Sequence, residues 1–248
     1  MGEVGTGKAG TVRLLGLIGI IGVLFTIASD LVLLGRPDTG YSFFRLGTSG
    51  MTGIESWRIT AGTFVGVFML PFQIAGLISL YYGLRPSGRI MPLIVLLTDA
   101  HALVMGVAFH ASYAFIAGGW KLFDAAGEGN MDVSRLISDF DFYWKLIIVI
   151  MFTELIASSV LFVLLVLKGR TLYPKWMAIS NPLCLTALLS LVIPVIPSPV
   201  GGFVGPAVLN LSTLIFFVMS TLLIYKKLKL QGKNYEYKFG DKAQENTV

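Results

Sequence analysis

The chain has 248 residues, of which 55% are hydrophobic and 13% are charged, and it carries a formal net charge of +5. A soluble domain has about a quarter of its residues charged, so this composition excludes an ordinary soluble domain and indicates an integral membrane protein. Cys184 is the single cysteine, which excludes an intrachain disulfide and a zinc site built from several thiolates. We expect no bound metal and no cofactor.

Six apolar runs are long enough to cross a bilayer, for which about 20 mainly apolar residues are needed. None of them alternates apolar and polar residues as the strands of a membrane barrel do. The predicted fold class is therefore all-α, a polytopic membrane bundle of six transmembrane helices. The six predicted spans cover residues 12–35, 59–84, 90–118, 143–167, 176–196 and 203–228.

The first apolar run is expected to be retained as a helix. It is longer than the roughly 7–15 apolar residues of a signal peptide core, and no small-residue cleavage site follows it. We take residues 1–230 as the six-helix transmembrane domain and residues 231–248 as a basic and polar cytoplasmic tail.

Lysine and arginine set the predicted orientation, because cytoplasmic connections are enriched in these residues. With the N-terminus inside, the inner segments hold 13 of the 19 lysines and arginines and the outer segments hold 6. Both termini are therefore predicted to be cytoplasmic, and the expected location is the plasma membrane. The positive excess then has a topological explanation, so the expected partner is the lipid bilayer and not nucleic acid. The pattern specifies no oligomeric state.

The outer connections have distinct compositions. Residues 36–58 are rich in Gly, Ser and Thr, whereas residues 120–144 are acidic and include DVSRLISDF, which is predicted to form a short interfacial helix. The last connection, VIPSPVGGFVGP, carries no charge and is expected to dip back toward the bundle. The tryptophans fall at predicted membrane boundaries, as aromatic belts do: Trp57, Trp120 and Trp144 outside and Trp176 inside.

Polar side chains within the spans are the candidates for a functional site, because ionisable groups at membrane depth are costly. The candidate pocket residues are Asp30, Asp99, His101, His110, Glu154, Asn181 and Asn210.

Helical geometry decides which of the third-span candidates can meet. Asp99 and His110 share a helix face but lie some ~16 Å apart along the axis, and Asp99 and His101 point roughly 160° apart. The stretch TDAHALVMGVAFHASYAF is therefore not a self-contained metal or acid–base site, and each group needs partners from other helices.

The rise of about 1.5 Å per residue gives the depth of each polar residue relative to the midpoint of its span, and these depths predict two polar layers. Asp30, His110 and Asn210 fall at one level toward the outside, and Glu154 lies with Asp99 and His101 at a middle-to-inner level.

Each candidate has a functional and a structural interpretation. The pair of His110 and Asp30 is either proton-sensitive or ligand-orienting, or a mutually satisfied structural pair. Glu154 is a proton carrier or catalytic acid, or the hydrogen-bonding partner of Ser158 or of a neighbouring helix. Asn181 precedes a proline and is expected to mark a bend, because proline removes a helical hydrogen bond.

Four segments together resemble an uncharacterised prokaryotic six-span family of unknown function. They are GTFVGVFMLPFQIAGLISLYYGLRP, AFHASYAFI, NP in the fifth span and GPAVLN in the sixth. The resemblance covers most of the chain and implies the six-span fold, but it implies no activity. The positions that match the family are Pro71, His110, Asn181, Pro182, Pro206 and Asn210.

Three functional classes stay open at this point. The leading hypothesis is transport or sensing of a small or amphipathic ligand, such as a lipid, through a polar intramembrane pocket. The first alternative is a membrane enzyme acting on a lipid, with His110 or Glu154 as the acid–base group and a serine or threonine as the nucleophile. The second is a structural or interaction subunit whose polar groups hold the helices together.

Overall fold

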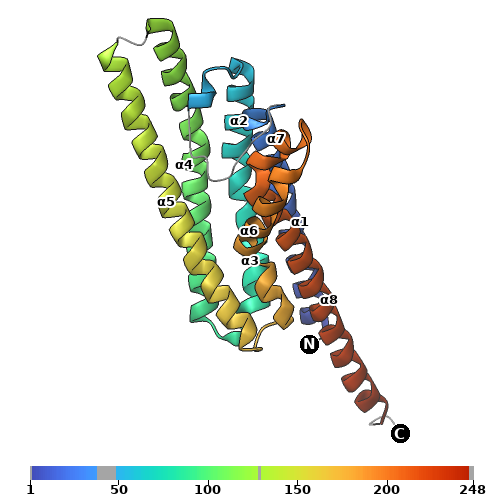
Figure 1. Ribbon diagram of the computed structural model, residues 1–248. Helices are drawn as coiled ribbons and strands as arrows, with labels where there is room; N and C mark the ends of the chain where they lie inside the picture. Colours follow the sequence, from blue (N-terminus) through green and yellow to red (C-terminus); the bar gives the residue numbers. More distant parts are fainter. Residues whose placement is uncertain (1, 38–48, 128–129, 246–248) are drawn as a thin grey trace.

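The computed structural model describes residues 2–37, 49–127 and 130–245, and all regular structure within them is helical (Figure 1). The α-helices are α1 (Gly2–Leu34), α2 (Ser56–Met69), α3 (Gln73–Leu84), α4 (Ile90–Ala126), α5 (Met131–Leu167), α6 (Pro182–Val192), α7 (Val200–Val204) and α8 (Val208–Glu245). Short 3-10 helices are η1 (Ser49–Met51), η2 (Leu70–Phe72), η3 (Arg85–Ser87), η4 (Lys175–Ser180), η5 (Ile193–Val195) and η6 (Gly205–Ala207). The all-α prediction is confirmed.

Five helical segments of the described chain are long and apolar enough to cross a membrane. They are Gly7–Leu34, Ser56–Ser87, Ile90–Ala126, Met131–Leu167 and Val200–Gly232. Large apolar side chains are also exposed along these helices, as on Phe64, Leu97 and Leu222. An apolar outer surface is what lipid solvates, so the chain is a multi-pass membrane protein.

The predicted fifth span, residues 176–196, has a different form from a single long helix. It consists of η4, the 11-residue α6 and η5, and its continuous apolar helix, Pro182–Val195, is shorter than the other five. Proline explains the break, because Pro182 has no N–H for a continuing helix and holds Asn181 in an extended conformation with ψ 158°.

This interrupted segment nevertheless joins the two ends of the bundle. Before it, the Leu172 N–H donates to the Gly83 carbonyl at 2.8 Å, beside the end of α3. After it, the Ser198 hydroxyl donates to the Pro37 carbonyl, beside the end of α1. The chain therefore passes the length of the bundle between Leu172 and Ser198.

Helix α1 is the central packing element, and it contacts α2, α3 and α8. A Cβ on Gly19 would lie 2.5 Å from the Gly76 Cα, and a Cβ on Gly62 would lie 2.6 Å from the Leu33 Cβ. Glycine at these crossings allows the backbones to approach as small residues do in membrane bundles. The α1–α3 contact brings Gln73 on α3 within hydrogen-bonding distance of Thr26 on α1.

The predicted second span is divided by Pro71. Helix α2 ends at Met69, η2 holds one tight turn, and α3 begins at Gln73. Proline lacks the amide hydrogen that a continuous α-helix needs, so the α-helical hydrogen bonding is interrupted at Pro71.

The pair α4 and α5 forms a long hairpin that extends past the other helices (Figure 1). Each has 37 residues, about 55 Å at 1.5 Å per residue, against about 30 Å for a hydrocarbon core. The short interfacial helix predicted at DVSRLISDF is wrong, because these residues form the first turns of α5. Asn130 caps that helix, and its side-chain oxygen accepts from the Val133 N–H at 3.2 Å.

The uncharged last connection lies against the end of α1. The Arg36 N–H donates to the Gly202 carbonyl at 3.3 Å, and the Arg58 side chain donates to the Val32 carbonyl at 2.8 Å and to the Gly35 carbonyl. The two Arg58 bonds satisfy carbonyl groups at the C-terminus of α1, which a helix leaves without internal partners.

Helix α8 continues without interruption into residues 231–245 of the predicted cytoplasmic tail, and residues 246–248 lie outside the described residues. It ends at Glu245, and its last turns project beyond the bundle (Figure 1).

Candidate functional site

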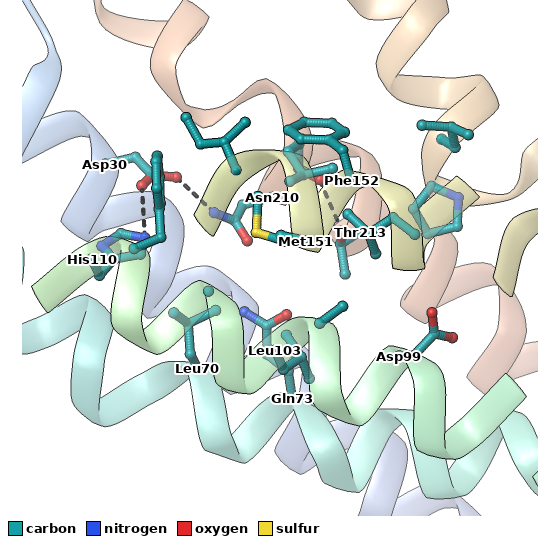
Figure 2. A pocket seen from close by; sticks show the side chains of 18 of the residues that line it. Asp30, Leu70, Gln73, Asp99, Leu103, His110, Met151, Phe152, Asn210 and Thr213 are labelled. Atoms are coloured by element: carbon teal, nitrogen blue, oxygen red, sulfur yellow. Dashed lines mark hydrogen bonds and ion pairs between the residues drawn. The ribbon is translucent and has the colours of Figure 1, made fainter. Parts of the chain in front are cut away.

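A cavity of about 740 Å³ lies within the bundle, and side chains of α1, α3, α4, α5, α6 and α8 line it (Figure 2). Of the seven residues predicted from the sequence, five line this cavity: Asp30, Asp99, His110, Asn181 and Asn210. His101 and Glu154 are not among the lining residues. The cavity therefore separates the predicted candidates into two groups.

Asp30, His110 and Asn210 come together from α1, α4 and α8. The Asn210 amide donates to Asp30 Oδ2 at 2.7 Å, and His110 Nε2 lies 3.5 Å from Asp30 Oδ1. Figure 2 shows both partners directed at the Asp30 carboxylate. Asp30 and His110 have side chains only 8% and 5% exposed, so this cluster is shielded from the surface.

The His110 ring fits against α2 because residue 66 is a glycine. A Cβ on Gly66 would lie 2.3 Å from His110 Nδ1, and Nδ1 has no hydrogen-bonding partner in the described structure. A buried unpaired acceptor is tolerated better than a buried unpaired N–H donor. This favours the neutral ring with its hydrogen on Nε2, directed at Asp30.

Three aromatic rings lie beside His110 and line the same cavity. Phe109 stacks on Trp144 with ring centroids 5.6 Å apart, and Tyr113 meets Trp144 edge-on at 6.2 Å. The prediction that Trp144 lies in an outer aromatic belt is wrong, since its side chain is buried at 4% exposure. The long α4–α5 hairpin explains the difference, because the extra turns of α5 place Trp144 inside the bundle.

Further along the cavity, Gln73 links α3 to α1. Its amide donates to the Thr26 hydroxyl at 3.1 Å, and Thr26 in turn donates to the Gly22 carbonyl at 2.8 Å. Gln73 is 1% exposed overall and lines the cavity between the levels of Asp30 and Asp99 (Figure 2).

A second polar point lies at Asp99 on α4. Asp99 and Ser158 on α5 both line the cavity. Figure 2 shows the Asp99 side chain well separated from the Asp30 cluster, as the eleven-residue spacing from His110 requires.

Asn181 serves a local structural role as well as lining the cavity. Its side-chain oxygen accepts from the Leu183 and Cys184 N–H groups at 3.1 Å, and its amide donates to the Ala178 carbonyl at 2.8 Å. These bonds cap the N-terminus of α6, so the bend expected at this position is a helix start.

His101 and Glu154 form a pair between α4 and α5 outside the cavity. His101 Nδ1 lies 2.5 Å from Glu154 Oε1, and the other carboxylate oxygen, Oε2, is buried without a hydrogen-bonding partner in the described structure. Asp99 does not take part in this pair, so the middle-to-inner layer divides into two separate contacts.

The sequence interpretation missed the aromatic part of the site. Phe109 and Tyr113 are four residues apart and share a helix face, on either side of His110 in the sequence. This four-residue spacing was the sequence signal that could have placed both aromatic rings near His110. Nothing local distinguishes a buried tryptophan from one at a membrane boundary.

Metal chemistry receives no support from the side chains. Among the described residues, no three His, Cys, Asp or Glu side chains are grouped closely enough to hold a metal ion.

The membrane-crossing helices and the polar groups that line the cavity define a multi-pass membrane protein with a ligand-sized pocket in its bundle. The chain belongs to a family of unknown function, DUF6796, whose family model matches residues 4–227. Neither a curated protein nor a solved structure matches the chain.

Proposed function

We propose that the protein crosses the plasma membrane six times and has both termini in the cytoplasm. The interrupted segment at residues 176–196 would be the fifth crossing, because hydrogen bonds anchor its two flanks at opposite ends of the bundle. The distribution of lysine and arginine supports the orientation. Residues 231–248 would then lie in the cytoplasm, with basic residues suited to anionic lipid.

Within this topology the protein binds an amphipathic small molecule or lipid in the cavity, as part of transport or sensing. The observation that carries this proposal is the cavity itself, whose volume of about 740 Å³ lies within the usual range for ligand sites. Its wall is mainly apolar, with polar groups at the level of Asp30 and again at Asp99. An elongated apolar space with polar groups at separate levels suits a molecule with a polar head and an apolar body.

Access from the bilayer supports an amphipathic ligand. Val149 on α5 lines the cavity and is also 61% exposed, so a single side chain lies between the cavity and the outer surface of the bundle there. Arg36 and the exposed Gly50 line another part of it, near the end of α1. A lipid-soluble molecule can therefore enter between helices.

The two alternatives receive less support. In the described structure, no serine, threonine or cysteine side chain hydrogen bonds with His110 or Glu154, as a nucleophile activated by either would. A purely structural subunit would fill its interior, since an empty cavity costs stability.

Filling the cavity tests the proposal directly. Gly106 on α4 lines the cavity, and a Cβ there would lie 3.6 Å from the nearest atom, on Leu70, so a Cβ fits without a clash. The rest of a leucine side chain at this position would project into the cavity and occupy the space of a ligand. We expect Gly106→Leu to abolish stabilisation of the purified protein by a panel of lipids and amphiphiles, measured as the shift in unfolding temperature.

Gly118 provides the matched control on the same helix. It is exposed, and a Cβ there would meet nothing within 4 Å. Gly118→Leu should keep the ligand-induced shift in full. Equal responses in the wild type and both variants, or no response to any amphiphile in the wild type, would disprove binding in this cavity.

A further inference from the structure

The charges that line the cavity are unbalanced. Asp30 and Asp99 are its two carboxylates. Its basic residues are Arg36 and His110, and the unpaired Nδ1 of His110 favours a neutral ring, so Arg36 is the one positive charge among the described lining residues. The Arg36 guanidinium donates to the Gly50 carbonyl. Among the described residues, neither carboxylate forms an ion pair with a lysine or arginine.

Asp30 is held by neutral donors. The Asn210 amide contacts one carboxylate oxygen, and His110 Nε2 approaches the other at the longer distance of 3.5 Å. A carboxylate buried in an apolar medium is costly unless a charged partner accompanies it. The protein orients this carboxylate toward the cavity without supplying that partner.

The rings beside the cluster are suited to the same kind of partner. Phe109, Tyr113 and Trp144 line the cavity at the level of His110. The negative face of an aromatic ring attracts a cation, and tryptophan does so best. A carboxylate together with several aromatic rings is a typical environment for an ammonium group.

We propose that the ligand is a cationic amphiphile whose ammonium group binds between Asp30 and the Phe109–Tyr113–Trp144 rings. The inference rests on the proposed function and names its ligand class. The alkyl part extends from this point past Leu70, Leu103 and Met151, apolar side chains that Figure 2 shows between the Asp30 cluster and Asp99. Methionine adapts its shape to irregular apolar ligands.

A headgroup series on the wild-type protein provides the first test. Dodecylamine, dodecanol and dodecanoate carry the same chain with a cationic, neutral or anionic head at neutral pH. We expect the amine to bind about tenfold more tightly than the alcohol, and the carboxylate most weakly, by calorimetry on full-length protein in a neutral detergent. Lysophosphatidylethanolamine against lysophosphatidylglycerol then distinguishes an ethanolamine phospholipid from a simple amine.

Single-residue variants locate the ammonium site. Asp30→Asn keeps the size of the side chain and removes the charge, so it should abolish the preference for the amine over the alcohol. Asp99→Asn should keep that preference. Asp124→Asn changes an exposed carboxylate outside the cavity and serves as the control. The wild-type headgroup series decides the ligand class even if Asp30→Asn fails to fold.

The outcomes separate this inference from the proposed function. If dodecanol or dodecanoate binds as tightly as dodecylamine, the cationic ligand is wrong and the cavity stays a binding site. If Asp30→Asn keeps the amine preference and Asp99→Asn loses it, the placement at Asp30 is wrong. If no amphiphile binds with any headgroup, the inference and the proposed function both fail.

Discussion

His101 Nδ1 lies 2.5 Å from Glu154 Oε1, and this contact joins α4 to α5 outside the cavity. The His101 side chain is 59% exposed, and Glu154 is 22% exposed. The closest ionisable pair between two membrane-crossing helices is thus separate from the candidate ligand site in the described structure.

The first prediction is that this pair contributes to helix packing and not to ligand binding. In a double-mutant cycle of His101→Leu and Glu154→Leu, the coupling free energy should be about 0.6 kcal/mol, the average for hydrogen bonds between membrane helices. Reversible unfolding in mixed micelles measures it. Loss of the amphiphile-induced thermal shift in Glu154→Gln would contradict the prediction and place the pair on the ligand path.

The second prediction concerns Asn210. Replacing it by leucine removes the donor to Asp30 Oδ2 and leaves a buried acceptor unpaired, which costs about 1–3 kcal/mol of unfolding free energy. Thr213→Val, one turn further along α8, is the control, because its hydroxyl bonds only its own helix, at the Leu209 carbonyl. Equal stability of the two variants would show that Asn210 does not support Asp30.

The third prediction tests the close approach of α1 and α3. A Cβ on Gly19 would lie 2.5 Å from the Gly76 Cα and 2.6 Å from its nitrogen, and backbone atoms cannot move aside. Gly19→Ala should therefore destabilise the protein by about 1–3 kcal/mol. On the same helix, Gly10→Ala meets nothing within 4 Å and should be neutral or slightly stabilising, because alanine favours helix. A reversed order of the two melting temperatures would refute this packing.

The fourth prediction concerns Tyr173, in the connection between α5 and α6. Its hydroxyl lies 2.6 Å from the Ser220 hydroxyl on α8, and its ring packs against Gly83. Tyr173→Phe should lower the unfolding free energy by about 1 kcal/mol. Tyr82→Phe, on an exposed side chain, should have no effect, and equal losses in the two variants would contradict the assigned bond.

Tyr173 also predicts a dependence on alkaline pH. Burial raises the pKa of its hydroxyl above the ordinary value of 10.0. Because the folded state then retains a proton that the unfolded state releases, this contribution to stability is complete below about pH 10 and is lost as the pH rises further. Wild-type protein should lose stability more steeply above pH 10 than Tyr173→Phe. Parallel curves for the two proteins would count against the buried hydroxyl.

Much of the polar geometry followed from local rules. The spacing of Asp99, His101 and His110 on one helix already separated them by face and by height. Depth matching placed Asp30 and Asn210 at the level of His110, and the structure brings these three side chains together. Helical rise and hydropathy repeat along the chain, so both can be worked out without knowing which helices are neighbours.

Tertiary contacts decided the remainder. The sequence by itself determined a helical membrane protein with polar groups at given heights. Only the folded chain showed that Glu154 pairs with His101, that Trp144 is buried beside Phe109, and that side chains of α5 and α8 line one cavity. Lateral neighbours depend on where glycines such as Gly19 and Gly66 let two surfaces meet, and that pairing is not encoded in the periodicity of either helix.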